Sequence, residues 1–103
     1  MDGASDAGGG RAALDSQAVP RLPRGVRLKE DKVRNRTVLL GPERTVGLDP
    51  VAAAIAGAVD GERNVAAIID HLAALYQAPR DVIERDALAF LGELARRRLL
   101  EFA

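Results

Sequence analysis

Hydrophobic and polar positions follow one period in the first half of the chain and another in the second half. Residues 26–29 alternate apolar and basic side chains, a pattern typical of a half-buried strand. Residues 37–40 (Thr-Val-Leu-Leu) and 45–48 (Thr-Val-Gly-Leu) are rich in β-forming types and predict two more strands. Polar residues at 30–32 and a Gly-Pro-Glu-Arg segment at 41–44 separate the strands. Short strands with such tight connections predict an antiparallel meander.

The second half of the chain predicts three helices. Asp49-Pro50 is a typical helix start, because Asp can accept a backbone N–H at the N-cap and Pro suits the first helical position. This helix is expected to end at 60–61 (Asp-Gly), Asn64 is a candidate cap for a second helix, and a third is expected over about 80–97. Apolar residues at helical spacing define the expected inward faces: Val51, Ile55, Ala58 and Val59; then Val65, Ile68, Ile69, Leu72, Leu75 and Tyr76; then Ile83, Ala87, Phe90, Leu91 and Leu94.

The remaining segments divide the chain into a tail and one domain. Residues 1–19 are rich in Gly, Ala, Asp and Ser and have little that could fill a core, so a disordered tail or linker is expected. Residues 20–103 are expected to form one domain, in which Leu99, Leu100 and Phe102 pack back as a short extended end. A three-stranded antiparallel sheet followed by three helices predicts an α+β fold. These are also the parts of a winged helix-turn-helix.

The composition removes most catalytic and metal-binding chemistry. The chain has no Cys, so disulfides and thiolate metal sites are excluded, and its one His, His71, has no second imidazole to share a metal with. Its two Ser residues both fall in the expected tail, and no nucleophile–base pair can be assembled. We therefore expect no enzyme activity, no cofactor and no metal. No apolar run reaches the roughly 20 residues that cross a bilayer, so a cytoplasmic protein without membrane contact is expected.

Charge is unevenly distributed, although the formal net charge is zero. Residues 21–48 carry eight Arg or Lys and three Asp or Glu, a local net charge of +5 that can attract an acidic partner. The expected third helix instead begins with Arg-Asp-Val-Ile-Glu-Arg-Asp at 80–86, and its three carboxylates would repel the phosphates of a nucleic acid. A winged-helix nucleic-acid-binding protein is therefore the alternative function that the charges disfavour.

The third expected strand, with Arg44 before it, is the candidate binding element. An edge strand of a three-stranded sheet has an unpaired row of backbone donors and acceptors. Gly47 would let another backbone approach closely, so an extended peptide can add to this edge as a further strand. The alternative is an ordinary edge strand that is protected by being short. Exposed edges also allow either a monomer or an edge-paired homodimer.

Several segments occur in an order and spacing that are specific when they are taken together. They are Arg-Gly-Val-Arg-Leu at 24–28, Val-Leu-Leu-Gly-Pro-Glu at 38–43, Leu-Asp at 48–49, Asp-Gly at 60–61, Ile-Ile at 68–69, Leu-Ala-Ala-Leu-Tyr-Gln-Ala-Pro at 72–79, and Phe-Leu at 90–91 with Leu94. Over roughly residues 20–102 the chain resembles the PqqD family, the peptide chaperone of pyrroloquinoline quinone (PQQ) biosynthesis. The first 19 residues lie outside this resemblance.

The resemblance implies a fold, a partner and a site. It implies a winged-helix-like recognition element that binds the leader of a ribosomal precursor peptide, PqqA, and presents it to PqqE, a radical S-adenosylmethionine enzyme. It implies no catalytic residues and no iron–sulfur cluster in this chain. It also implies a groove in which the peptide adds to the third strand and packs on the third helix. The residues that would form this groove are Arg44, Thr45, Val46, Gly47 and Leu48 on the strand and Ala87, Leu91 and Leu94 on the helix.

Overall fold

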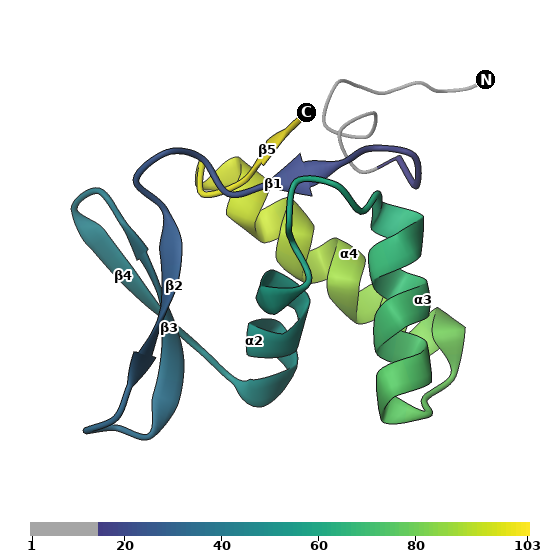
Figure 1. The fold of residues 1–103 in the computed structure, drawn as a ribbon, viewed down its shortest axis with the longest axis horizontal. Helices are drawn as coiled ribbons and strands as arrows, with labels where there is room; N and C mark the ends of the chain where they lie inside the picture. Colours follow the sequence, from purple (N-terminus) through teal and green to yellow (C-terminus); the bar gives the residue numbers. More distant parts are fainter. Residues whose placement is uncertain (1–14) are drawn as a thin grey trace.

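A computed structural model describes residues 15–103, in which a three-stranded sheet stands beside three helices (Figure 1). The sheet consists of β2 (Arg27–Asp31), β3 (Arg36–Gly41) and β4 (Arg44–Leu48), in the order β2-β3-β4. Both pairs of neighbours are antiparallel. The predicted meander is therefore confirmed, with β3 in the centre and β2 and β4 at the two edges.

The two faces of this sheet have different roles. Leu39, at the centre of β3, pairs with Leu28 on β2 and with Val46 on β4, and it is fully buried in the core. Side chains alternate between the faces of a strand, so these three residues share the inner face with Leu48, which is also buried. Val38 lies on the opposite, outer face, which no helix of residues 15–103 covers (Figure 1).

The helices are α2 (Pro50–Gly57), α3 (Val65–Tyr76) and α4 (Arg80–Arg96). α2 follows β4 directly and contacts the sheet, while α3 and α4 pack against each other and against α2. The predicted α+β fold, with a sheet followed by three helices in the manner of a winged helix-turn-helix, is confirmed. Among the described residues, no helix is both long enough and apolar enough to cross a membrane.

Side-chain caps begin the first two helices where the sequence predicts them. The Asp49 carboxylate accepts the N–H of Ala52 at 2.7 Å, and the Asn64 side chain accepts the N–H of Ala67 at 2.8 Å. Each cap satisfies a backbone donor that the first turn of a helix leaves free, which is worth about 1 kcal/mol. α3 ends at Tyr76, and the left-handed backbone of its C-cap residue Gln77 (φ 51°) terminates the helix.

Two predicted inward faces are only partly buried. The α3 stripe is buried as far as Leu72, but Leu75 and Tyr76 are 61% and 55% exposed, and Val51 at the start of α2 is 52% exposed, so these three predicted core positions are wrong. Leu75 and Tyr76 lie in the last turn of α3, after which the chain turns at 77–79 and enters α4 (Figure 1). Helical period identifies the stripe, but it does not tell how far the neighbouring helices extend.

A second, smaller sheet joins the two ends of the domain. β1 (Pro20–Arg21) pairs antiparallel with β5 (Glu101–Phe102). The Nε of Arg21 donates to Glu101 at 2.8 Å, and both side chains are about half exposed. The extended end predicted near Phe102 is present, and β1 is the partner that the sequence did not identify.

The predicted tail, residues 1–19, lies mostly outside the described residues, since the structure describes the chain from Asp15 onward. Its last five residues are described, and they contact the start of α3. The carbonyl of Ser16 accepts the N–H of Ala66 at 3.0 Å, and the carbonyl of Ala18 accepts the N–H of Val65 at 2.9 Å. The domain therefore begins before Pro20, the boundary expected from composition.

Candidate functional site

The open edge of β4 is formed by alternate residues of the strand. β3 and β4 are joined by the two-residue turn Pro42-Glu43, and Gly41 pairs with Arg44. A turn of this length is closed by a hydrogen bond between the residues that flank it, and hydrogen-bonded pairs alternate along an antiparallel ladder. Thr45 and Gly47 are therefore the β4 residues that direct their backbone N–H and C=O groups away from β3. Both are exposed.

Gly47 is in contact with a side chain from the neighbouring strand. A Cβ placed on Gly47 would lie 2.7 Å from Cζ and from one guanidinium nitrogen of Arg36. Real Cβ atoms do not approach other atoms this closely, so glycine leaves the space that the guanidinium occupies. The sequence suggested that Gly47 makes room for an incoming backbone, whereas here it makes room for an arginine on the outer face of β4.

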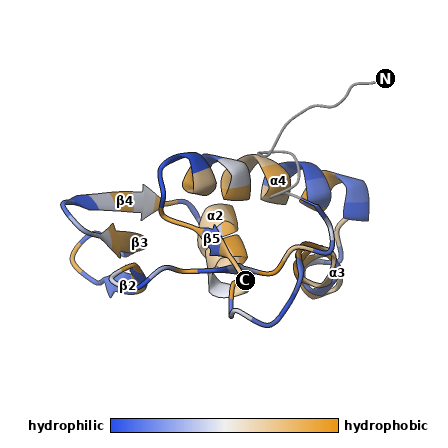
Figure 2. Cartoon of the chain, turned by 90° about the horizontal axis from the view of Figure 1, so that it is seen from above, coloured by the Kyte–Doolittle hydropathy of each residue, from blue (hydrophilic) through white to orange (hydrophobic). Residues whose placement is uncertain are grey.

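An open hollow begins where β4 ends. It has a volume of about 460 Å³ and lies between the start of α2 and the middle of α4; its lining residues are Asp49, Val51, Ala52, Ile55, Asp86, Ala89 and Phe90. β4 and α4 lie on the same side of the molecule, while β2 lies on the opposite side (Figure 2). A strand added to β4 would therefore run beside α4 and reach this hollow.

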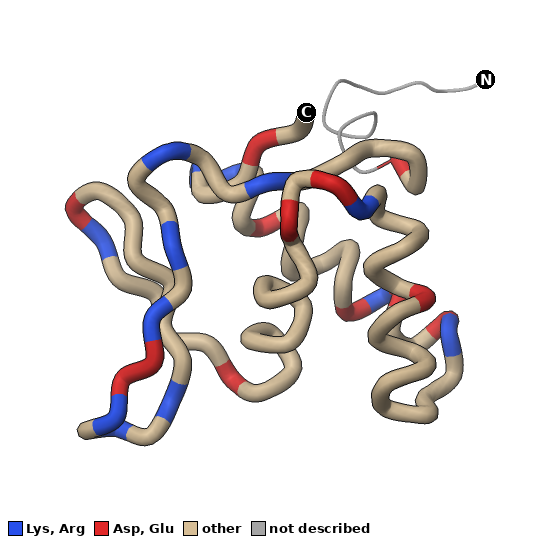
Figure 3. Tube along the Cα trace, in the orientation of Figure 1, with Lys and Arg blue, Asp and Glu red and all other residues tan. Residues whose placement is uncertain are grey.

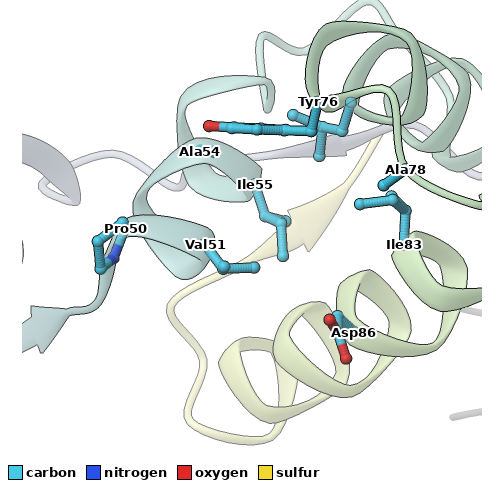
Figure 4. Close-up of a pocket in the computed structure, with 9 residues that line it drawn as sticks. Pro50, Val51, Ala54, Ile55, Tyr76, Ala78, Ile83 and Asp86 are labelled. Carbon is cyan, nitrogen blue, oxygen red and sulfur yellow. The ribbon is translucent and has the colours of Figure 1, made fainter.

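A second, mostly apolar hollow of about 250 Å³ adjoins the first and extends to the end of α3. The two share Val51, Ile55 and Asp86. Side chains of Val51, Ile55 and Ile83 point into it, and the ring of Tyr76 covers it from the α3 side (Figure 4). The exposure of Tyr76 and Val51, unexpected for core positions, is explained by this surface, which is accessible to an apolar side chain.

The predicted wall on α4 lies elsewhere than expected. Ala87 and Leu91 have no exposed surface and Leu94 is 2% exposed, so all three pack in the core and do not line either hollow. Ala89 and Phe90 line the hollow between α2 and α4 instead. The sequence places Phe90 on the inward face with Ala87 and Leu91, but in the structure it is only partly buried, at the margin of that face. Apolar spacing alone does not tell a residue at the margin of the stripe from one at its centre.

Basic side chains are frequent along the sheet, while acidic side chains are spread over the sheet, the helices and the loops (Figure 3). Arg27, Lys29 and Arg36 are exposed on the outer face of the sheet, and no carboxylate of residues 15–103 lies within 4 Å of them. Arg34, in the turn between β2 and β3, differs because its guanidinium pairs with Asp31 at 3.3 Å. The outer face thus offers free cations to an acidic ligand.

The start of α4 does not present free cations. The Nε of Arg80 lies 2.6 Å from a carboxylate oxygen of Asp70, and its Nη1 lies 3.6 Å from Glu84. The hydrogen bond to Asp70 raises the pKa of Arg80 above its ordinary value, which holds the pair in its charged form. An arginine engaged in this way is not available to bind phosphate, which agrees with the acidic character predicted for this helix.

No metal-binding cluster occurs within the described part of the chain. His71 is exposed on α3, and no group of three His, Asp or Glu residues there is arranged to hold a metal ion. The surface around β4 offers three kinds of contact to a ligand: backbone groups at the β4 edge, apolar side chains in the two hollows, and charge on the outer face.

Comparison with known sequences identifies similar proteins. A family model for coenzyme PQQ synthesis protein D (PqqD) matches residues 36–100. The chain is 47% identical over 88 residues to the PqqA binding protein of Rhizobium meliloti, covering 85% of this chain and 90% of that protein. It is 49% identical over 89 residues, 86% of this chain, to the bifunctional coenzyme PQQ synthesis protein C/D of Methylorubrum extorquens, of whose length it spans 24%.

Solved structures show the same architecture. The solution structure of the PqqD truncation of Methylobacterium extorquens PqqCD, described as a stand-alone RiPP recognition element, superposes with a TM-score of 0.76 at 49% identity, covering 86% of this chain and 95% of that one. TbiB1 in complex with the TbiA(β) leader peptide superposes with a TM-score of 0.67 at 29% identity, covering 79% of this chain and 94% of that one.

Proposed function

The chain belongs to the PqqD family, and from this premise we propose that it binds the precursor peptide PqqA by strand addition to β4 and presents it to the radical S-adenosylmethionine enzyme PqqE. The proposed role is that of a cytoplasmic peptide chaperone, and no bond is made or broken by this chain. The observation that carries the proposal is the open β4 edge, which ends at a hollow beside α4 that is lined by apolar side chains and by Asp49 and Asp86.

Two properties of this site support an extended peptide as the ligand. Thr45 and Gly47 offer backbone groups to a strand, and backbone pairing gives affinity that depends little on sequence. The hollows accept apolar side chains, and burying such a side chain contributes about 1.5–3 kcal/mol. The sequence identities to PqqA binding proteins, at 43–47% for several relatives, support PqqA as that peptide.

Titration of the chain with PqqA from the same genome tests peptide binding. We expect saturable heat in calorimetry, and in NMR the largest amide shifts over Arg44–Leu48. The free-edge amides of Thr45 and Gly47 should also exchange more slowly with solvent in the complex, because they gain a partner. Binding without any change at these two amides would contradict strand addition, and no binding at all would contradict the whole proposal.

Presentation to PqqE requires a separate measurement. We expect that PqqE modifies PqqA faster when this chain is present at stoichiometric concentration, and that the three components elute together in gel filtration. Equal rates of PqqA modification with and without the chain would leave peptide binding intact and refute presentation.

A further inference from the structure

We propose that Arg36 is a specificity-determining residue, which selects a peptide with a carboxylate at the position paired with Gly47. This inference rests on the proposed strand addition and names the chemistry of the peptide that the site prefers. The selected segment has an acidic residue with an apolar residue on each side of it. Arg36 belongs to β3, but its guanidinium reaches across to β4, the strand to which the peptide would add.

The position of Arg36 follows from the register of the sheet. Val38 pairs with Gly47, and Arg36 precedes Val38 by two residues on the same face of β3. A long side chain at such a diagonal position can cover its neighbour on the next strand. The guanidinium lies so close to the Gly47 backbone that a Cβ there would be 2.7 Å from Cζ. The charge of a central strand is thereby held over an edge strand.

An added strand would bring a side chain next to this charge. Residues directly opposite in paired strands point to the same face, with Cβ atoms about 4.5–5.5 Å apart. The residue opposite Gly47 would therefore project on the outer face, beside the guanidinium of Arg36. A carboxylate there can accept two hydrogen bonds from a guanidinium, a geometry that neutral side chains do not match.

Arg36 forms no ion pair with a carboxylate of residues 15–103. Asp31 lies directly opposite Arg36 in the register, but its carboxylate pairs with Arg34 at 3.3 Å, and no carboxylate in that part of the chain lies within 4 Å of the Arg36 guanidinium. An exposed arginine without an ion pair can bind an anion. Arg34 is of the same type and nearby, and it serves as the matched control.

The inner face of the same edge selects apolar neighbours. Residues before and after the acidic one would point to the opposite face, because side chains alternate along a strand. That face carries Val46 and the buried Leu48, and it leads to the hollow lined by Ala52 and Phe90. The site therefore distinguishes an apolar–acidic–apolar segment from one in which the charges fall on the inner face.

A double-mutant cycle tests the assignment. Arg36→Gln and Arg34→Gln are titrated by calorimetry with PqqA and with PqqA variants in which each Asp or Glu is replaced singly by its amide. We expect one amide substitution to weaken binding to the native chain about tenfold, the scale of a charged hydrogen bond. Arg36→Gln should bind unmodified PqqA about tenfold more weakly than the native chain does. It should bind the amide peptide no more weakly than it binds unmodified PqqA, because the ion pair is already lost. Arg34→Gln should behave as the native chain does.

The outcomes separate this inference from the proposed function. If the native chain does not bind PqqA, both fall together. If the native chain binds PqqA and the affinity of Arg36→Gln is within twofold of the native affinity, the role of Arg36 is refuted and strand addition stands. The same holds if the affinity lost through Arg36→Gln adds to the affinity lost through the amide substitution in the peptide. Gly47→Ala supplies a second variant, in which the new Cβ must displace the guanidinium. It should reduce the preference for the acidic peptide over its amide, and an unchanged preference would also refute the assignment.

Discussion

The two edges of the sheet, β2 and β4, have the same length and opposite properties. β2 (Arg-Leu-Lys-Glu-Asp) is charged at four of its five positions, whereas β4 (Arg-Thr-Val-Gly-Leu) is charged only at its first. Charged side chains along an edge discourage the addition of another strand. An uncharged edge lacks this protection, so β4 is the edge at which a further strand is tolerated.

The surroundings of the two edges differ as well. β4 leads into α2 and a hollow lined by apolar residues of α2 and α4, while β2 lies on the far side of the sheet from α4 (Figure 2). Backbone pairing alone gives little selectivity, and specificity comes from pockets for alternate side chains. Low charge and an adjoining hollow therefore favour β4 over β2 as the edge for the proposed strand addition.

The largest expected effect comes from removing one free donor at the β4 edge. In Thr45→Pro the residue keeps an extended backbone but loses the N–H that faces away from β3. Proline is tolerated at such a position of an edge strand, because the missing N–H does not pair within the sheet. We expect binding of PqqA to weaken by about tenfold or more, because a hydrogen bond to the added strand is lost and a peptide carbonyl stays unpaired. Calorimetry measures this loss, and thermal unfolding checks that the variant is folded.

Glu30→Pro is the matched control on the opposite edge. The register pairs Glu30 with Thr37, and the alternation that leaves Thr45 free on β4 leaves Glu30 free on β2. We expect PqqA binding within twofold of the native chain. If the two proline variants lose the same affinity, the comparison between the edges fails and the peptide does not choose β4.

A smaller effect is expected when charge is placed in the hollow. Ala89 is an exposed α4 residue that lines the hollow, and Ala89→Glu would narrow it and introduce a carboxylate next to Asp86. We expect PqqA to bind about fivefold more weakly, since an apolar side chain of the peptide loses its contact. Ala74→Glu, at an exposed position of α3 outside both hollows, makes the same change elsewhere and should have no effect on affinity. Equal losses in both variants would point to a general charge effect.

Local signals predicted most of the fold correctly. The helix caps at Asp49 and Asn64 depend on a side chain and a backbone group three residues away, and both are confirmed. The strands follow from patterns over a few residues, and β4 (Arg44–Leu48) covers the strand predicted at 45–48 with one further residue at its start. Such features need only the neighbouring sequence, so they could be predicted without knowledge of the tertiary structure.

Features that depend on distant parts of the chain could not be predicted. The β1–β5 pair joins residues about eighty positions apart, and its strands have two residues each, too few for a pattern. The groove wall was assigned to Leu91 and its stripe because apolar character alone does not separate core residues from groove residues. The contact between Arg36 and Gly47 depends on strand register, which alternation leaves undetermined until both turns are known.

A still smaller effect concerns the two turns that border the edge strands. Each turn has a residue with a left-handed backbone: Asn35 between β2 and β3 (φ 54°) and Glu43 between β3 and β4 (φ 63°). Asn tolerates this conformation, whereas most residues with a Cβ are strained there by roughly 1–2 kcal/mol. We expect Glu43→Gly to raise the free energy of unfolding by about 0.5–1 kcal/mol, after the entropy cost of glycine. Chemical denaturation measures this, and a decrease in stability would show that Glu43 makes a compensating interaction.

The smallest effect should appear at low pH and only on the β2 side. The Asp31 carboxylate accepts the N–H of Arg34 at 3.2 Å, and this hydrogen bond lowers the pKa of Asp31 below its ordinary value. Because the pKa of Asp31 is lower in the folded state, the ionised carboxylate stabilises the turn at pH values above the pKa of the unfolded state, about 4. This contribution is lost as the pH falls through the pKa of the folded state. In an NMR titration from about pH 6 to about pH 3, the Arg34 amide should shift with the Asp31 titration while the Val46 amide in the middle of the opposite edge strand stays unchanged. Asp31→Asn should abolish the Arg34 shift, and a shift that persists in this variant, or that Val46 shares, would mean that the two edges respond to acid as one unit.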